Sequence, residues 1–378
     1  MKIAIFGGTF NPVHKEHVNI VKSAIEKLAL DKVIVMPSYA TPKKNGKMLA
    51  SCTDRLNMCR LAFSSVPKVT VSDYEISKKE ISYSYITCRE FKKRYPSDDR
   101  YFIIGGDMLE NFPEWKMPEE ILKCVNLAVC AREDTQKLVN SENRFKAHFN
   151  KNIVKFDFIG ENLSSTKIRT LIALNENFTE FVDKNTEKYI LQSTMYRING
   201  AKTVKSMLST KRWQHTVRVA LMAAQNCGRL DLSEKSAITS ALFHDCAKEL
   251  PLNDNRLKDF KLYGDMPETV IHQFSGAYLA EHYFGVKDSE IINAVRYHTT
   301  GRENMSPLEK LIFLCDMLEA GRSYSGVEEL RKVFEEDIDK ALFAALERQV
   351  KHLNEKNQKI YYLTQNALDY LKEDKYDK

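Results

Sequence analysis

Short apolar runs alternate with amphipathic segments over the first half of the chain. The runs are bounded by Gly, Pro or Asp and predict strands at residues 3–6, 32–36, 69–71, 101–104, 127–130 and 153–158. Between them, apolar positions recur at helical spacing, as in residues 17–28, 54–63 and 85–94. Near-continuous apolar strands are typical of a parallel sheet that is buried on both faces. The pattern predicts a doubly wound α/β fold, with ligands bound at the carboxyl ends of the strands.

The pattern changes near residue 196. Strand-like runs stop, and long helical periodicities follow at residues 213–227, 234–243, 268–284, 289–297, 307–320 and 337–349. The second half is therefore predicted to be all-α. We place the boundary between residues 192 and 200, which gives domains of residues 1–195 and 196–378. A chain of 378 residues is long enough to bury two such cores.

Composition narrows the classes of partner. The net charge of +6 mildly favours anionic ligands, but the charges are dispersed and form no basic stripe interleaved with aromatic residues. We therefore expect no nucleic-acid partner. No run approaches about 18 consecutive apolar residues, so we also expect no membrane partner. The eight cysteines form no C-x-x-C pair, which is typical of reduced thiols and predicts a cytoplasmic protein.

The segment after the first predicted strand carries candidate chemistry. It reads Gly-Gly-Thr-Phe-Asn-Pro-Val-His-Lys-Glu-His over residues 7–17. Two glycines at a strand end let backbone amides approach a phosphate closely. His14 and His17 share one face at the positive end of the next helix. The segment is neither a G-x-G-x-x-G fingerprint nor a P-loop. It predicts a phosphate site, with a metal-binding histidine pair or plain surface histidines as alternatives.

Further motifs follow in order along the first half. They are Ser-Tyr-Ser at 82–84, Gly-Gly-Asp at 105–107, Trp115, Arg132 and Leu-Ser-Ser-Thr-Lys-Ile-Arg at 163–169. With the glycine segment, they resemble the motifs of nicotinate-nucleotide adenylyltransferases, which have the class I aminoacyl-tRNA-synthetase-like superfold. The resemblance covers residues 1–192. The departures are Asn11 for aspartate, Glu16 for glycine and Ser84 for threonine.

The resemblance implies that AMP is transferred from ATP to nicotinate mononucleotide, which gives deamido-NAD and pyrophosphate. Mg²⁺ would bridge the triphosphate, largely through water and phosphate oxygens. Nicotinate is favoured over nicotinamide, and phosphopantetheine is a more distant alternative acceptor. Catalytic roles are implied for His14, His17 and Arg169. The implied ATP- and substrate-binding residues are Gly7, Gly8, Thr9, Phe10, Lys44, Tyr83, Ser84, Gly105, Asp107, Trp115, Arg132, Ser164, Ser165 and Thr166.

Some of these residues also have a plainer explanation. The resemblance implies that Trp115 and Tyr83 stack on the pyridine ring and that Asp107 binds a ribose hydroxyl or orients the acceptor. Taken by itself, Trp115 is more typical of a half-buried packing aromatic. Residues 164–166 also have the composition of an ordinary helix N-cap.

A second candidate site lies in the helical half. His244 and Asp245 are adjacent within an apolar helical segment, and His215 and Asp316 lie on separate predicted helices. An ionised aspartate in a helical core is costly unless a metal ion or another partner compensates it. An isolated His-Asp pair is more often a solvent-facing pair. The neighbouring motifs therefore decide between a metal site and a surface pair. They are Lys248, His272, residues 297–302 (Tyr-His-Thr-Thr-Gly-Arg) and residues 315–322 (Cys-Asp-Met-Leu-Glu-Ala-Gly-Arg).

Together these residues resemble the HD-domain metal phosphohydrolases, and within them the symmetrical diadenosine tetraphosphate hydrolases, over about residues 200–375. The resemblance implies hydrolysis to two ADP at a divalent transition metal, iron or manganese. Asp245 and Lys248 would be catalytic. The implied metal ligands are His215, His244, Asp245 and Asp316, and the implied phosphate contacts are His272, His298, Thr299 and Arg322.

Two questions about the helical half remain open. The first is whether His272 and His298 contact phosphates or bind a second metal. As a whole, the chain is predicted to be bifunctional, with ATP, nicotinate mononucleotide and diadenosine tetraphosphate or ADP as ligands. The alternative is a monofunctional adenylyltransferase whose HD module senses nucleotides and regulates the enzyme.

Overall fold

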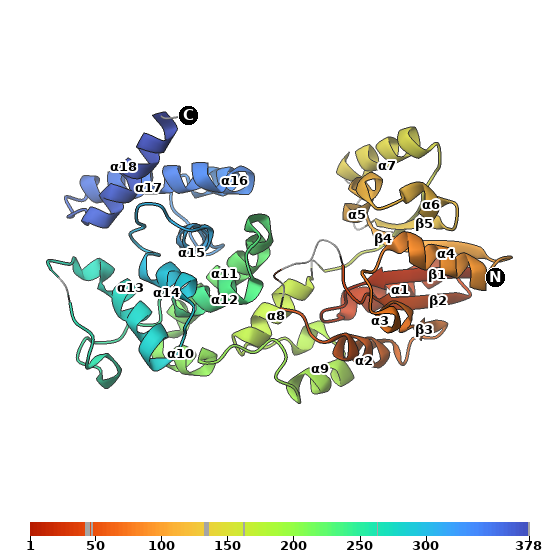
Figure 1. Cartoon of the computed structure of the whole chain (residues 1–378), viewed down its shortest axis with the longest axis horizontal. Helices are drawn as coiled ribbons and strands as arrows, with labels where there is room; N and C mark the ends of the chain where they lie inside the picture. Colours follow the sequence, from red (N-terminus) through yellow and green to blue (C-terminus); the bar gives the residue numbers. More distant parts are fainter. Residues whose placement is uncertain (42–45, 47, 132–135, 162, 263, 377–378) are drawn as a thin grey trace. The chain divides into compact units, whose positions relative to one another are not determined.

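The computed structural model describes residues 1–41, 46, 48–131, 136–161, 163–262 and 264–376. The chain divides into two compact units (Figure 1). Unit 1 comprises Met1–Lys44, Leu49–Ile168 and Asn177–Met195, and unit 2 comprises Asn45–Met48, Arg169–Glu176 and Tyr196–Lys378.

Unit 1 is built on a parallel sheet of six strands in the order β3-β2-β1-β4-β5-β6. This confirms the predicted doubly wound α/β fold. The order reverses between β1 and β4, and ligands of such sheets bind beside that reversal, at the carboxyl ends of the strands. The strands are β1 (Lys2–Gly8), β2 (Lys32–Pro37), β3 (Val69–Val71), β4 (Asp99–Gly105), β5 (Asn126–Ala131) and β6 (Val154–Asp157).

Helices cover the sheet of unit 1, whose strand residues Ile3, Ala4 and Ile5 are fully buried. Burial on both faces explains why the strands read as continuous apolar runs. The helices are α1 (Lys15–Lys27), α2 (Cys52–Phe63), α3 (Tyr74–Lys78), α4 (Ser84–Arg94), α5 (Gly106–Glu110), α6 (Pro118–Leu122), α7 (Gln136–Phe149), α8 (Ser165–Ala173) and α9 (Lys184–Leu191), with 3₁₀ turns at Phe112–Glu114 and Thr179–Phe181. The division between the units falls inside α8, after Ile168.

The described residues of unit 2 contain helices and no strand, which confirms the predicted all-α half. The helices are α10 (Ala201–Met207), α11 (Thr210–Asn226), α12 (Glu234–Phe243), α13 (Glu268–Tyr278), α14 (Ser289–Arg296), α15 (Pro307–Leu318), α16 (Val327–Glu336), α17 (Ile338–Glu355) and α18 (Tyr362–Tyr376), with 3₁₀ turns at Cys227–Leu230 and Asn255–Leu257. The helix predicted over 268–284 ends at Tyr278, and a π-helical turn continues it over Leu279–Tyr283.

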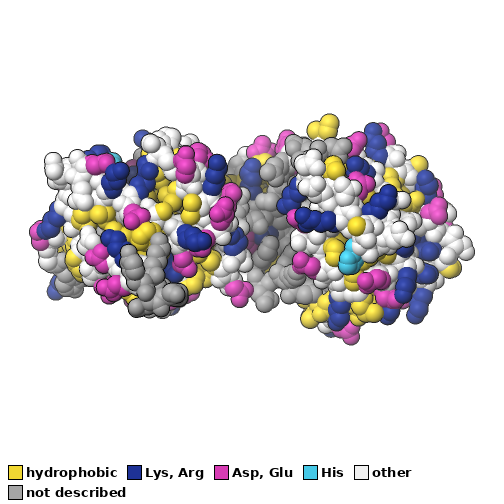
Figure 2. Space-filling view, turned by 90° about the horizontal axis from the view of Figure 1, so that it is seen from above, with side chains coloured by type: hydrophobic (Ala, Val, Ile, Leu, Met, Phe, Trp, Pro, Cys, Tyr) yellow, Lys and Arg dark blue, Asp and Glu magenta, His cyan; other side chains and the backbone are white. Residues whose placement is uncertain are grey.

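The core of unit 2 includes α12 and α15, whose side chains Ile238, Leu242, Leu311 and Ile312 are fully buried. None of the described helices is both long enough and apolar enough to cross a membrane. On the face shown in Figure 2, Lys and Arg side chains are interspersed with Asp and Glu, in line with the dispersed charge of the sequence.

Candidate functional sites

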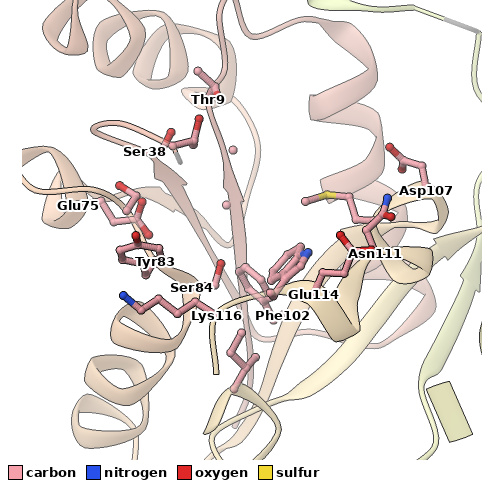
Figure 3. Close-up of a pocket in the computed structure, with 17 residues that line it drawn as sticks. Thr9, Ser38, Glu75, Tyr83, Ser84, Phe102, Asp107, Asn111, Glu114 and Lys116 are labelled. Carbon is pink, nitrogen blue, oxygen red and sulfur yellow. The ribbon is translucent and has the colours of Figure 1, made fainter. Parts of the chain in front are cut away.

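A cavity of about 580 Å³ opens in unit 1 beside the reversal between β1 and β4 (Figure 3). Residues from the ends of β1 and α5 and from the start of α4 face it, as expected for ligand sites in doubly wound sheets. The sequence-predicted residues that line it are Gly7, Gly8, Thr9, Tyr83, Ser84, Asp107 and Trp115. Ser82, from the Ser-Tyr-Ser motif, also lines it. Nine other lining residues were not among the predicted binding residues: Ser38, Thr41, Glu75, Phe102, Met108, Asn111, Glu114, Lys116 and Ile121.

Arg55 on α2 holds this end of the sheet together, and sequence reasoning missed it. Its side chain is only 2% exposed. The guanidinium donates to the carbonyl oxygens of Thr9 at 2.8 Å, Ser38 at 2.7 Å and Tyr39 at 3.0 Å. It therefore ties the loop after β1 to the chain that leaves β2. The only sequence signal for this role is that a charged residue, Arg55, occupies a position on the buried side of α2.

His14 and His17 lie together at the start of α1. Their ring centroids are 3.7 Å apart, and the backbone N–H of His14 donates to Nδ1 of His17 at 3.2 Å. With Nδ1 as an acceptor, a neutral His17 ring carries its proton on Nε2, so that Nε2 is a donor. Both rings lie at the positive end of the helix dipole. This arrangement suits the binding of phosphate oxygens.

The motif at the start of α8 is divided between two roles. Ser164 accepts a hydrogen bond from the backbone N–H of Lys167 at 3.2 Å, as an N-cap does. Ser165 donates to the carbonyl oxygen of Pro12 at 2.9 Å, which ties α8 to the loop after β1. None of the residues Ser164, Ser165 and Thr166 lines the cavity.

Arg169 at the end of the same motif forms a buried ion pair. Its guanidinium is 2% exposed, and its Nε and Nη2 donate to the two carboxylate oxygens of Glu234 at 2.9 and 2.5 Å. Both residues belong to unit 2, and Arg169 is absent from the cavity lining. Within unit 2, the buried partner of Arg169 is therefore a carboxylate.

Two of the four remaining predicted residues of the first site, Phe10 and Gly105, are described by the structure. Phe10 is buried and packs its ring against that of His17, with centroids 5.1 Å apart. A Cβ atom at Gly105 would lie 2.5 Å from Oδ1 of Asp107, so glycine leaves room for this carboxylate to fold back over the end of β4. Lys44 and Arg132 lie outside the described residues.

A second cluster lies in unit 2, where side chains from separate helices converge on Asp245. Its Oδ2 lies 3.4 Å from Nε2 of His244 and 3.7 Å from Nε2 of His215. Its Oδ1 lies 3.4 Å from Nε2 of His272 and 3.6 Å from Nε2 of His298. Asp316 on α15 reaches Nε2 of His215 at 2.9 Å. The structure thus brings all the predicted metal ligands and both further histidines together.

The donor atoms of this cluster fit metal ions. Two groups of buried side chains, His215–His244–Asp245 and Asp245–His272–His298, have candidate ligand atoms within 4.8 Å of one another. The histidines of the two groups lie near different oxygens of the shared Asp245 carboxylate. The Nδ1 atoms of His244 and His298 hydrogen-bond to backbone carbonyls at 2.6 and 2.7 Å. Nδ1 of His215 hydrogen-bonds to Glu319 at 3.1 Å. These bonds place the lone pairs of the Nε2 atoms inside the cluster, as second partners of metal-binding histidines do.

The protonation states also suit metal binding. Burial opposes ionisation of Asp245, but contacts with His244 and His298 hold the pKa of its carboxyl well below the usual range. Burial, together with the nearby His298 and Lys248, lowers the pKa of His272 to about 2. The cluster therefore offers an ionised carboxylate and a neutral imidazole, which are the forms that bind metals.

Cationic and hydroxyl groups surround the cluster. The Lys248 ammonium lies 3.1 Å from both ring nitrogens of His272, and Oγ1 of Thr299 lies 3.0 Å from Nε2 of His298. Arg322 pairs with Asp316. Sequence reasoning missed two further residues at the cluster: Arg212, which pairs with Asp245 at 2.8 Å, and Arg218, which donates to Glu319. Glu319 lies within the motif at residues 315–322, but no role was assigned to it.

Unit 1 is a doubly wound sheet with a glycine loop and a histidine pair, which is the architecture of a nucleotidyltransferase-type domain. Unit 2 is helical and holds a buried His/Asp cluster, as an HD-type metal domain does. Comparison with known families agrees. Residues 5–171 match the cytidylyltransferase-like family, and residues 212–321 match the HD domain family.

Relatives with both domains match almost the whole chain. A protein of Mycoplasma genitalium named probable nicotinate-nucleotide adenylyltransferase/Ap4A hydrolase is 31% identical over 354 residues, which are 91% of this chain and 97% of the relative. The protein of the same name in Mycoplasma pneumoniae is 30% identical, over 84% of this chain and 88% of the relative. A probable nicotinate-nucleotide adenylyltransferase of Clostridium tetani is 34% identical over 52% of this chain and 99% of its own length. The chain belongs to the nicotinate-nucleotide adenylyltransferase/Ap4A hydrolase family, which confirms the fusion predicted from the motifs.

Proposed function

We propose that the chain is a bifunctional enzyme. Unit 1 transfers AMP from ATP to nicotinate mononucleotide, and unit 2 hydrolyses diadenosine tetraphosphate symmetrically to two ADP. The cavity beside the glycine loop carries the first half of the proposal, and the position of Asp245 between two pairs of histidines carries the second. Family membership supports both halves.

Adenylyl transfer needs orientation and charge stabilisation more than covalent help from the protein. A phosphate oxygen of the mononucleotide bonds to the α-phosphorus of ATP as the bond to the β-phosphate breaks, and pyrophosphate leaves with the electron pair. His14 and His17 hold phosphate oxygens, and His17 would donate through Nε2–H, because its Nδ1 accepts from the backbone N–H of His14. Tyr83 and Trp115 stack on the pyridine ring, and Asp107 binds a ribose hydroxyl. Mg²⁺ bound through phosphate and water oxygens would neutralise part of the triphosphate charge.

The cluster in unit 2 has donor atoms for two metal ions. His215, His244 and Asp316, with Oδ2 of Asp245, would hold one ion, and His272 and His298, with Oδ1 of Asp245, would hold the second. Bound divalent ions lower the pKa of water and polarise a phosphoryl oxygen. The mixed nitrogen and oxygen donors suit iron or manganese.

The substrate of unit 2 is held by groups around the cluster. Lys248, Thr299 and Arg322 donate hydrogen bonds to phosphate oxygens next to the bond that breaks. Water adds to an inner phosphorus, and ADP leaves with the electron pair of the broken P–O bond, so that both products are ADP.

The test uses the full-length protein and two separate assays. ATP with nicotinate mononucleotide should give deamido-NAD and pyrophosphate, and diadenosine tetraphosphate with Mn²⁺ or Fe²⁺ should give ADP alone. His244→Ala should abolish hydrolysis and metal binding and leave adenylyl transfer intact. His282→Ala is the matched control, because His282 is exposed on unit 2 away from the cluster.

The outcomes separate the two halves of the proposal. Full hydrolysis by the His244→Ala protein would disprove the metal assignment. Nucleotide binding by unit 2 without turnover, in the metal-loaded wild type, would instead support a monofunctional adenylyltransferase with a regulatory HD module.

A further inference from the structure

Acidic side chains outnumber basic ones among the described residues that line the cavity of unit 1. Among the described lining residues, Glu75, Asp107 and Glu114 carry carboxylates, and Lys116 is the single cationic side chain. The carboxylate of Glu75 accepts a hydrogen bond from Oγ1 of Thr87 at 2.5 Å. Among these described side chains, a ligand anion therefore meets repulsion from the carboxylates and attraction from Lys116.

Lys116 lies in the aromatic part of the cavity. Its ammonium is 4.2 Å from the centroid of the Tyr83 ring, a distance at which a cation and a ring attract each other. Trp115 precedes it in the chain and also faces the cavity. In Figure 3, Lys116 extends beside Tyr83, and Thr9 from the glycine loop lies well apart from it. The ammonium thus belongs to the end of the cavity with the aromatic rings and not to the end with the glycine loop.

We propose that Lys116 determines the choice of acceptor by binding the carboxylate of the pyridine ring. This inference rests on the proposed adenylyl transfer in unit 1. A pyridine ring stacked on Tyr83 or Trp115 brings its ring substituent close to the ammonium. Nicotinate carries an anion at that position and nicotinamide carries a neutral amide. A charge-assisted hydrogen bond is about twice as strong as a neutral one, so the lysine favours the acid.

The competing role for Lys116 is a contact with the phosphate of the mononucleotide. Both acceptors carry the same phosphate, so this role predicts no discrimination between them. The two roles therefore predict different effects of a Lys116 substitution on the ratio of the rates with the two acceptors, and not only a loss of rate.

The experiment compares Lys116→Met and Lys116→Arg with the wild type in the full-length protein. Methionine keeps an apolar stem over Tyr83 and removes the charge, and arginine restores a cation. Lys93→Met is the matched control, since Lys93 is an exposed lysine of α4 outside the cavity lining. The readouts are kcat and KM for nicotinate mononucleotide, for nicotinamide mononucleotide and for ATP.

For Lys116→Met we expect kcat/KM with nicotinate mononucleotide to fall about tenfold or more, mainly through KM, since one charge-assisted hydrogen bond is lost. Turnover of nicotinamide mononucleotide and the KM for ATP should change by less than about threefold, because neither involves the carboxylate. Lys116→Arg should recover most of the preference, and Lys93→Met should match the wild type.

Three results would overturn the inference. Equal losses with both acceptors would place Lys116 at a shared group, and an unchanged preference would mean that it does not read the ring substituent. In both cases the proposed function would survive. A wild-type protein that adenylylates neither acceptor would overturn the proposed function, and this inference with it.

Discussion

Glu319 is predicted to set the metal affinity of unit 2 although it is not a ligand itself. Its carboxylate is 2% exposed and accepts hydrogen bonds from Nδ1 of His215 at 3.1 Å, from the backbone N–H of Gly321 at 2.6 Å and from Arg218. The bond to His215 fixes the ring so that Nε2 faces the cluster, and the negative charge makes that ring a better donor to a metal.

The size of the effect follows from these contacts. Loss of an outer partner of a metal-binding histidine typically costs 10- to 100-fold in metal affinity, or about 1.4–2.7 kcal/mol. Glu319→Gln keeps an acceptor oxygen and the side-chain volume but removes the charge, so we expect about a tenfold loss. Glu319→Ala leaves the buried donor of His215 without its acceptor, at about 1–3 kcal/mol, and should also destabilise unit 2.

The assay is a Mn²⁺ titration of the metal-free full-length protein, with hydrolysis followed as a function of free metal. Glu329→Gln serves as the control, because Glu329 is an exposed carboxylate of α16. Glu319→Gln should need about ten times more metal for half-maximal activity and reach a similar maximum at saturation. Equal metal affinity in the Glu319→Gln and control proteins would refute the reasoning.

Three other predictions follow from the contacts of both units. Arg55→Met should lower the free energy of unfolding by about 2–4 kcal/mol in a denaturant titration, since buried carbonyl oxygens lose their donors; a change below 0.5 kcal/mol, on the order of a surface substitution, would contradict this. Arg169→Met should cost about 3–5 kcal/mol because the buried carboxylate of Glu234 loses its cationic partner, and adding Glu234→Met should recover much of the loss if the pair is the cause. Burial alone would lower the pKa of His215, but hydrogen bonds with two neighbouring carboxylates raise it above its usual value. Protons then compete with metal at this ring, so metal affinity measured by titration should fall as the pH decreases through that pKa, and a pH-independent affinity would exclude this competition.

Both the fold class and the family were accessible from the sequence, for a local reason. A strand buried on both faces must be apolar along its whole length, so the run at residues 3–6 is visible without any partner strand. The all-α half was visible in the same way, because helical periodicity is a property of one segment. The boundaries were less accurate, since the helix expected over 268–284 passes into a π-helical turn after Tyr278.

The candidate sites were only partly accessible. His244 and Asp245 are adjacent, so their chemistry was readable as a motif, whereas Arg212 and Arg218 were not singled out. Their partners lie 33 and 101 residues away in the chain, and an arginine at helical spacing looks the same whether it faces solvent or a buried carboxylate. Lys116 was missed for a similar reason, because only the fold places its ammonium against the ring of Tyr83.

The sequence by itself determined the class of each segment, strand or helix, and which motifs are candidates for phosphate and metal chemistry, because these depend on neighbours within a few residues. The tertiary structure decided which side chains meet. Arg169 shows the difference: its motif implies a phosphate contact, and the structure pairs it with Glu234, 65 residues further on. A buried guanidinium must find an acceptor, and the identity of that acceptor is set by the packing of helices and not by the motif in which the arginine lies.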